Sequence, residues 1–146
     1  MISCFPLSQG RRIRSGVTIA AHEMEADIQR EIVRYIEILA PAVLVFAIPN
    51  AASRTRTGRA SNAVAGLKKG VFDLGLILPG QVGAVAFIEV KTTRGKLSAE
   101  QQHFQDVLIR NRVRHCVART IDDVREALKI WGVPTREHLP RVEATA

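Results

Sequence analysis

The sequence predicts an α/β domain in which a central mixed four-stranded sheet is flanked by helices. Apolar residues recur at helical spacing over residues 24–39, and two apolar runs flank a glycine-rich turn at residues 79–83. Helix-start signals at Ser98 and Thr120 mark two later helices. The expected order is helix, three strands, helix, strand, helix. It gives a three-strand meander plus a fourth strand that the chain reaches through a helix.

The first helix is expected between Met24 and Leu39 and ends at Pro41. One helical face, with spacing i, i+3, i+7, i+11 and i+14, carries the residues Glu25, Ile28, Ile32, Ile36 and Leu39. Residues 1–22 lack this periodicity and contain several arginines. We therefore expect a flexible basic N-terminal arm over residues 1–22, followed by one folded domain over residues 23–132.

Three strands are expected next. The first is the short apolar run Val43–Ile48, which ends at a proline. The other two, Val71–Leu78 and Ala84–Lys91, flank the turn and form a hairpin. A basic stretch rich in glycine, serine and alanine separates the first strand from the hairpin, and it is expected to be a loop with a short helical turn over residues 62–69.

The second helix is expected to begin at Ser98, because Ser98 and Gln101 fit the spacing of a capping box. It runs to about Arg112, and a short strand follows at His115–Arg119. Thr120 caps a last helix that ends near residues 131–132. Residues 133–146 show no pattern, so a mobile C-terminal tail is expected there.

Charge points to the class of partner. The 146 residues carry a formal net charge of +7, with a sequence pI near 10.2, which favours a densely anionic partner such as nucleic acid. Residues 51–70 contain no acidic residue, and the predicted DNA-binding residues in this segment are Arg54, Arg56, Arg59, Lys68 and Lys69. The alternative is that this basic segment is only solvated surface.

Several classes of protein are disfavoured. The two cysteines, Cys4 and Cys116, form only one possible pair and are interpreted as reduced thiols. No apolar run reaches the roughly 18 residues of a membrane span, and no signal peptide is visible. The expected location is therefore the cytoplasm, which is the bacterial host's if the protein is phage-encoded. The histidines lack zinc-ligand spacing, and no nucleotide-binding glycine motif is present.

The hairpin brings the most informative residues together. Glu89 and Lys91 lie two apart on one strand and so share a face, and Asp73 lies on the partner strand. Charges inside an apolar run are costly unless they are paired, and a hard cation such as Mg²⁺ takes carboxylate oxygens. The Val90 carbonyl would add a third oxygen, and Lys91 would orient or deprotonate the attacking water, or stabilise phosphate charge. The alternative is a purely structural ion pair.

Two further residues are candidates for the same site. Glu25 lies at the edge of the apolar stripe of the first helix and faces the sheet, where Gln29, one turn later, is expected to hold it. Gln101 begins the second helix just past the Lys91 strand, so its amide can reach the site. Simple helix capping is an equally good interpretation of Gln101 at this stage.

With these residues in place, the chain resembles the PD-(D/E)XK nuclease superfamily and, more narrowly, a stand-alone VRR-NUC domain of the phage and bacterial type. The matching blocks are Glu25–Gln29, Pro49-Asn50, Gly70–Leu74, Ile88–Thr92 and Leu97–Gln101. This resemblance implies a restriction-endonuclease-like αβββαβ core and Mg²⁺- or Mn²⁺-dependent DNA cleavage. It also implies homodimers that act on branched DNA such as four-way (Holliday) junctions. Phe72 departs from the family, which usually has proline there.

The leading hypothesis is thus a divalent-metal-dependent endodeoxyribonuclease that is selective for branched DNA. Its expected catalytic residues are Glu25, Asp73, Glu89, Lys91 and Gln101, and its expected metal ligands are Asp73, Glu89, the Val90 carbonyl and Glu25, the last directly or through water. The alternative is a non-catalytic DNA-binding or assembly module with the same fold. A restriction enzyme that reads sequence is a weaker option, because no recognition domain is visible in so short a chain.

Overall fold

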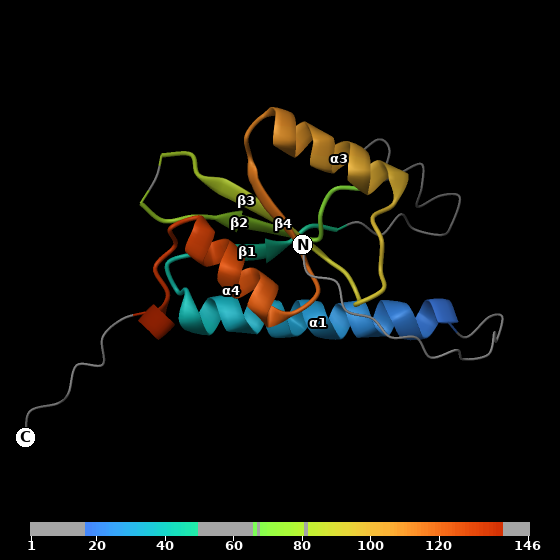
Figure 1. The fold of residues 1–146 in the computed structure, drawn as a ribbon, viewed down its shortest axis with the longest axis horizontal. Coiled ribbons are helices and arrows are strands. Elements are labelled where there is room, and N and C mark those ends of the chain that lie inside the picture. The colour runs from blue at the N-terminus through green and yellow to red at the C-terminus, as the bar shows by residue number, and fades with distance from the viewer. Residues whose placement is uncertain (1–16, 50–65, 67, 81, 139–146) are drawn as a thin grey trace, which may run out of the picture.

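The computed structural model describes residues 17–49, 66, 68–80 and 82–138, and its elements follow the expected order. They are α1 (Val17–Leu39), β1 (Leu44–Ala47), β2 (Leu74–Ile77), β3 (Val85–Val90), α3 (Ala99–Arg110), β4 (Arg114–Ala118), α4 (Ile121–Ile130) and the 3-10 helix η1 (Arg136–His138). The strands form one sheet in the order β1-β2-β3-β4 (Figure 1). The first three pair antiparallel, and β4 joins β3 in parallel. The predicted mixed four-stranded sheet is therefore confirmed.

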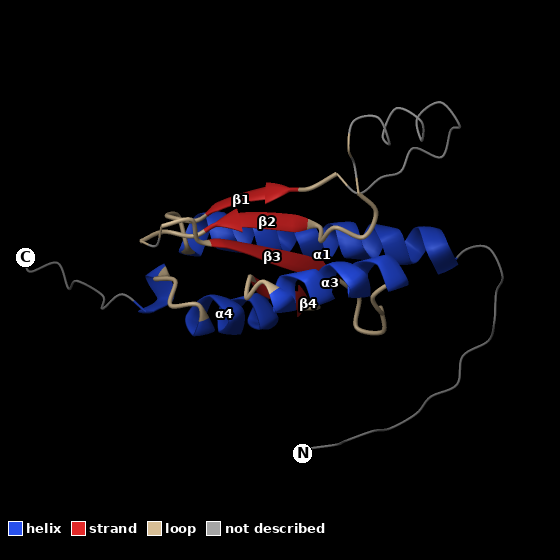
Figure 2. Ribbon diagram, turned by 90° about the horizontal axis from the view of Figure 1, so that it is seen from above, coloured by secondary structure: helices blue, strands red, loops and turns tan. Residues whose placement is uncertain are grey.

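The sheet separates two layers of helices, as the view from above in Figure 2 shows. Alternate residues of the central strands point into the larger layer, because side chains on a strand alternate between faces. There they pack with α1 and α4 into the main core. Its fully buried members are Ile32, Ile36, Ala40, Leu74, Leu76, Ala86, Ile88, Ala118, Val124 and Leu128. The expected inner face of the first helix is thus the face that the structure buries.

The opposite face of the sheet carries α3 over a cluster of aromatic rings. Phe72, just before β2, is fully buried, and its ring meets Phe104 of α3 edge-on at 5.4 Å between centroids. Phe104 also meets Phe87 of β3 at 5.5 Å, and Phe72 lies 6.3 Å from the His115 ring. Edge-to-face packing of this kind is favourable beyond simple burial. Phe72, the residue that departs from the family pattern, therefore helps to seat α3 on the sheet.

The N-terminal boundary differs from the expectation. Helix α1 begins at Val17 rather than Met24, so residues 17–22 belong to the helix and not to a flexible arm. The segment shows no apolar period, and only Ala20 and Ala21 favour helix formation strongly, since Val17, Thr18 and Ile19 are weaker helix formers. The sequence therefore gives only a weak local signal for this extension. No helix among the described residues, α1 included, has the length and apolar character needed to cross a membrane.

The C-terminal boundary also differs, because the chain stays packed through residue 138. Val133 and Thr135 are buried, and η1 follows directly. Within η1, Glu137 accepts hydrogen bonds from the Tyr35 hydroxyl at 3.1 Å and from Arg125 Nε at 3.0 Å. These contacts tie the segment to α1 and α4. The start of the tail expected to be mobile from residue 133 is therefore part of the fold.

Candidate active site

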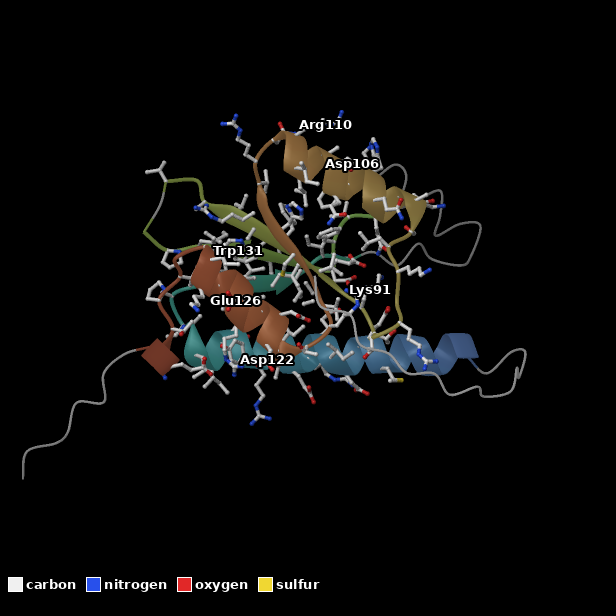
Figure 3. All side chains as sticks on the ribbon, in the orientation of Figure 1. Lys91, Asp106, Arg110, Asp122, Glu126 and Trp131 are labelled. Carbon is white, nitrogen blue, oxygen red and sulfur yellow. The ribbon has the colours of Figure 1, made fainter. Side chains whose placement is uncertain are left out.

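Glu89 lies at the centre of the candidate site, on the face of β3 that looks toward α3. Its side chain is fully buried, yet its Oε1 accepts from Lys91 Nζ at 2.7 Å and from the Gln101 side-chain amide. Its other oxygen, Oε2, is buried without a hydrogen-bond partner. A buried polar atom of this kind is costly, and an unpaired carboxylate oxygen is what a cation site requires. The Lys91 ammonium lies between α1 and α3 (Figure 3).

Asp73 faces the same layer as Glu89. The register pairs Leu74 with Ile88, so that Asp73 and Glu89 are the next neighbours across the two strands. Asp73 Oδ2 accepts from the Val90 amide at 2.9 Å. Since the amide and carbonyl of one strand residue point to the same neighbouring strand, the Val90 carbonyl also points toward Asp73. The two acidic groups and this carbonyl therefore lie at one end of the hairpin, as the sequence led us to expect.

The electrostatics of Glu89 follow from this crowding. The pKa of Glu89 is raised to about 7, mainly by burial; the negative charges of Asp73 and Glu25 also raise it, while the hydrogen bond and charge of Lys91 lower it. At neutral pH the group is therefore balanced between its charged and neutral forms. Burial alone would leave it neutral, so Lys91 is the group that keeps the carboxylate available as an anion.

The raised pKa of Glu89 predicts that stability falls as pH rises. Between pH 5 and 8 the folded protein holds a proton at Glu89 that the unfolded chain releases, so the free energy of unfolding decreases with pH across this window. The decrease is about 3 kcal/mol, at about 1.4 kcal/mol for each pKa unit. We expect urea unfolding in EDTA to show it, and Glu89→Gln, which cannot titrate, to flatten the profile. An equally steep profile in the variant would contradict this assignment.

Gln101 connects the start of α3 to the site. Its side-chain Oε1 accepts from the Ser98 amide at 2.9 Å, and the Ser98 hydroxyl accepts from the Gln101 amide at 3.2 Å, which completes the predicted capping box. The same side chain donates through Nε2 to Glu89. Gln101 therefore serves both as a helix cap and as a site residue. Its side-chain oxygen caps α3, and its side-chain nitrogen donates to the Glu89 carboxylate.

Gly70 lets the chain pass against the first turn of α3. It has a φ of +78°, in the left-handed region that favours glycine. A Cβ placed at Gly70 would lie 2.4 Å from the backbone carbon of Glu100. The segment that leads to Asp73 and the helix that carries Gln101 are thus in close backbone contact.

We expect Gly70→Ala to lower the free energy of unfolding by about 2–4 kcal/mol, because left-handed strain of about 1 kcal/mol adds to overpacking of about 1–3 kcal/mol. Gly80→Ala is a matched control, since Gly80 has a similar φ of +76° but open space around its Cβ position. The difference between the two variants in urea unfolding isolates the contact with α3. Equal losses would show that the contact imposes no constraint.

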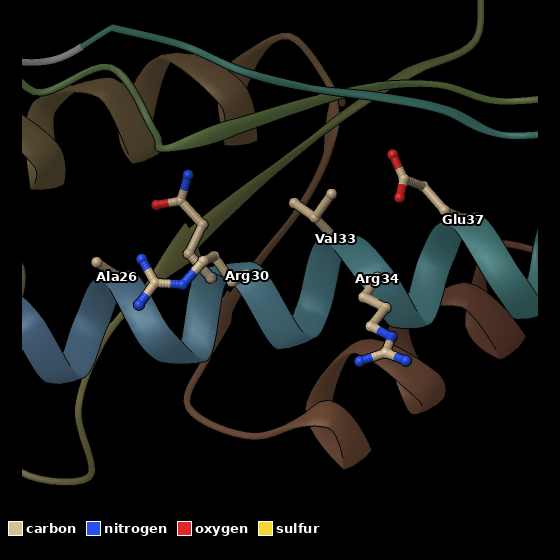
Figure 4. Close-up of a pocket in the computed structure, with 6 residues that line it drawn as sticks. Ala26, Arg30, Val33, Arg34 and Glu37 are labelled. Carbon is tan, nitrogen blue, oxygen red and sulfur yellow. The ribbon is translucent and has the colours of Figure 1, made fainter.

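Glu25 approaches the site from α1. Its carboxylate accepts from the Thr92 amide at 3.4 Å, directly after the Glu89–Lys91 segment. The expected support from Gln29 is wrong, because no hydrogen bond joins these two side chains in the described structure. Gln29 instead lines a groove of about 560 Å³ along α1, together with Ala26, Arg30, Val33, Arg34 and Glu37 (Figure 4). The groove begins one residue beyond Glu25.

The residues present suit a hard cation in chemistry. Asp73 and Glu89 supply carboxylate oxygens, the donors that Mg²⁺ prefers, and Glu89 Oε2 has no other partner. Over the described ranges, no group of three or more His, Cys, Asp or Glu side chains is gathered closely enough to hold a metal ion. Two carboxylates with a backbone carbonyl would suit Mg²⁺, which often fills its remaining positions with water and substrate oxygens.

The predicted DNA-binding residues are only partly visible. Arg54, Arg56 and Arg59 lie outside the described residues. Lys68 and Lys69 are exposed, just ahead of Gly70. The charge of Lys69 reaches the first turn of α3, where it adds a small part to the lowered pKa of Glu100, whose largest causes are hydrogen bonds from its own backbone amide and Ser98. The described end of this basic segment is thus next to the candidate site.

The fold and the grouped acidic residues, lysine and glutamine define a nuclease-type domain with a restriction-endonuclease-like core. A family model for the VRR-NUC domain matches residues 21–121, well over half of the chain. This protein belongs to the VRR-NUC domain family. A solved structure described as a VRR_NUC domain shares the fold, with a TM-score of 0.52 and 20% identity over 73% of this chain and 95% of that one. No curated protein matches the sequence.

Proposed function

We propose that this protein is a divalent-metal-dependent endodeoxyribonuclease that hydrolyses phosphodiester bonds. The observation that carries the proposal is the buried grouping of Glu89 with Lys91, Gln101 and Asp73, in which one Glu89 oxygen has no protein partner. A structural ion pair would use that oxygen or expose it to water, because an unsatisfied buried carboxylate oxygen destabilises the fold. Membership of a family with a nuclease-type fold supports the same conclusion.

In this proposal Asp73 and Glu89 hold the cation, assisted by the Val90 carbonyl and by Glu25 directly or through water. A bound Mg²⁺ or Mn²⁺ would supply charge neutralisation at the phosphate and an activated water. Gln101 fixes Glu89 Oε1 and so turns Oε2 toward the cation. The Val90 amide fixes Asp73 in the same way.

The role of Lys91 follows from its position. Its ammonium is nearly buried and is held by Glu89 Oε1 at 2.7 Å, so it enters the reaction as a fixed positive charge. A fixed charge in a site of low dielectric stabilises the charge that develops on the scissile phosphate more effectively than a mobile one. We propose that Lys91 stabilises this charge or orients the attacking water.

The finer features of the proposal come from the family resemblance. Small stand-alone members are expected to act as homodimers on branched DNA such as four-way junctions. One site cuts one strand, so two symmetric sites would make paired nicks. Analytical ultracentrifugation of the full chain tests the dimer independently of activity, and a monomer at micromolar concentration would remove this part of the proposal alone.

The decisive experiment is incubation with end-labelled linear duplex, flap and four-way-junction DNA in Mg²⁺, Mn²⁺ or EDTA. We expect cleavage of the junction with either metal and none in EDTA. Glu89→Gln should be inactive under all conditions, and this control excludes a contaminating nuclease. Binding of every substrate without cleavage in either metal would overturn the enzyme and favour the non-catalytic module with the same fold.

A further inference from the structure

The segment Thr92–Lys96, which we name the rim loop, borders the candidate site beside Glu25 and Lys91. It leaves β3 directly after Lys91, and its first amide donates to Glu25 of α1 at 3.4 Å. A turn closes where the Gly95 amide donates to the Thr92 carbonyl at 2.9 Å. The chain then rises to Ser98 and the start of α3 (Figure 1). The rim loop thus connects the helices that carry Glu25 and Gln101.

The rim loop has a fixed position relative to Lys91. Arg119, at the end of β4, donates from its guanidinium to the Gly95 carbonyl at 2.9 Å. A Cβ at Gly95 would lie 3.1 Å from Lys91 Cδ and 3.2 Å from Lys91 Cβ, so this part of the loop rests on the aliphatic stem of the lysine. A tertiary hydrogen bond and close packing together hold the loop against the residue proposed to act on the phosphate.

The rim loop presents two cations that have no acidic partner. Arg94 and Lys96 are exposed, and neither side chain makes an ion pair or hydrogen bond within the described structure. Arg110 on α3 reaches only the Asp106 backbone carbonyl, but three other basic residues on the helices lie against carboxylates. Arg30 pairs with Asp27 on α1, Arg125 pairs with Asp122 and Glu137, and Lys129 lies 4.0 Å from Glu126 on α4. The positive charge of the rim loop is therefore not neutralised locally, whereas these helix charges are.

We infer that the rim loop is a phosphate-binding element, in which Arg94 and Lys96 contact the backbone of the DNA strand that lies at the candidate site. The inference rests on the proposed function for the identity of the polymer. Lys69 lies near the start of α3, so a second basic residue approaches the carboxylates from a different part of the chain. Gly95 covers the stem of Lys91, so a polyanion bound at the ammonium of that lysine would lie beside the rim loop.

The test is DNA binding in EDTA, measured by fluorescence anisotropy with a labelled four-way junction at several salt concentrations. The variant is Arg94→Gln with Lys96→Gln. Each phosphate contact contributes about 0.9 to the slope of log affinity against log salt on duplex DNA, so we expect the slope to fall by about 1.8. Equivalently, the loss of affinity between 50 and 200 mM salt becomes about twelvefold smaller.

The matched control removes two charges from positions remote from the site. Arg112→Asn with Lys129→Gln acts beyond the C-terminal end of α3 and at the far end of α4, and asparagine tolerates the left-handed φ of 55° at position 112. The control should keep the wild-type slope. Charge reversal, Arg94→Glu with Lys96→Glu, should weaken binding further, and circular dichroism verifies that every variant is folded.

The outcomes separate the inference from the proposed function. Equal slopes for the rim-loop variant and the control would overturn the inference, even if the wild-type protein cleaves junctions with Mg²⁺. A reduced slope in the rim-loop variant alone supports the inference, even if no cleavage is found with any metal. Failure of the wild-type protein to bind DNA in EDTA would also overturn it.

Discussion

Replacing Lys91 by alanine is expected to abolish metal-dependent cleavage while leaving DNA binding intact. Loss of a fixed charge that stabilises a transition state typically costs 10²–10³-fold or more in rate, on the order of 3–4 kcal/mol. Lys91 has a second effect, on Glu89, because its hydrogen bond and charge lower the pKa of that carboxyl group. Without the lysine, that carboxyl is held as a neutral acid at pH 7 and becomes a poorer cation ligand.

The same substitution has a stability signature that depends on pH. Breaking a buried ion pair costs about 3–5 kcal/mol when the remaining group stays charged. Glu89 can avoid this cost by binding a proton, so we expect Lys91→Ala to be less destabilising at pH 6 than at pH 8. Urea unfolding at the two pH values measures the difference.

Lys129→Ala is the matched control for Lys91→Ala. Its side chain is 65% exposed on α4, and exposed substitutions of this kind change stability by less than about 0.5 kcal/mol. Cleavage and binding should match the wild type in this control. Full cleavage by Lys91→Ala with Mg²⁺ would count against the nuclease mechanism, whereas lost DNA binding in EDTA would show that the lysine serves substrate affinity.

Phe72→Ala is expected to destabilise the fold by about 3–5 kcal/mol, the typical cost of truncating a buried phenylalanine. Phe72 is fully buried and bridges the sheet to Phe104 of α3, so alanine leaves a cavity under the helix that carries Gln101. We therefore expect a lower urea midpoint together with reduced cleavage. Phe72→Leu, which fills more of the space, should lose less of both.

Ile109→Ala is the control on the same helix, because its side chain is 57% exposed and makes no comparable core contact. It should change stability by less than about 0.5 kcal/mol. A loss below about 1 kcal/mol for Phe72→Ala would mean that α3 is seated by other contacts. The position at which the family usually has proline would then have no structural role here.

Local sequence signals accounted for most of the fold. Both capping boxes, Ser98 with Gln101 and Thr120 with Asp123, are present and mark the true starts of α3 and α4. Period-2 patterning placed the hairpin, although β2 spans only Leu74–Ile77 because the chain bends at Asp73. These signals did not predict the start of α1 at Val17. They also missed the segment around η1, which tertiary contacts hold in place.

The candidate site shows the same division. The types and spacing of Asp73, Glu89 and Lys91 were sufficient to predict a shared face, since strand geometry fixes side-chain direction. The groups that hold these three side chains in place were harder to predict from the sequence. Gln29 was assigned to Glu25, but a main-chain amide at Thr92 takes that place, and neither the Arg119 hydrogen bond to Gly95 nor the contact of Gly70 with α3 leaves a periodic signal in the sequence.

The sequence by itself determined the order of the elements, the caps of the helices and the set of acidic and basic residues at the end of the hairpin. Each of these depends on neighbours a few residues apart, which backbone geometry places in a known way. Only the tertiary structure decided that Glu89 is fully buried, that one Gln101 amide serves both helix and carboxylate, and that the rim loop rests on Lys91. These features join segments far apart in the chain, and their contacts exist only after the helices have packed on the sheet.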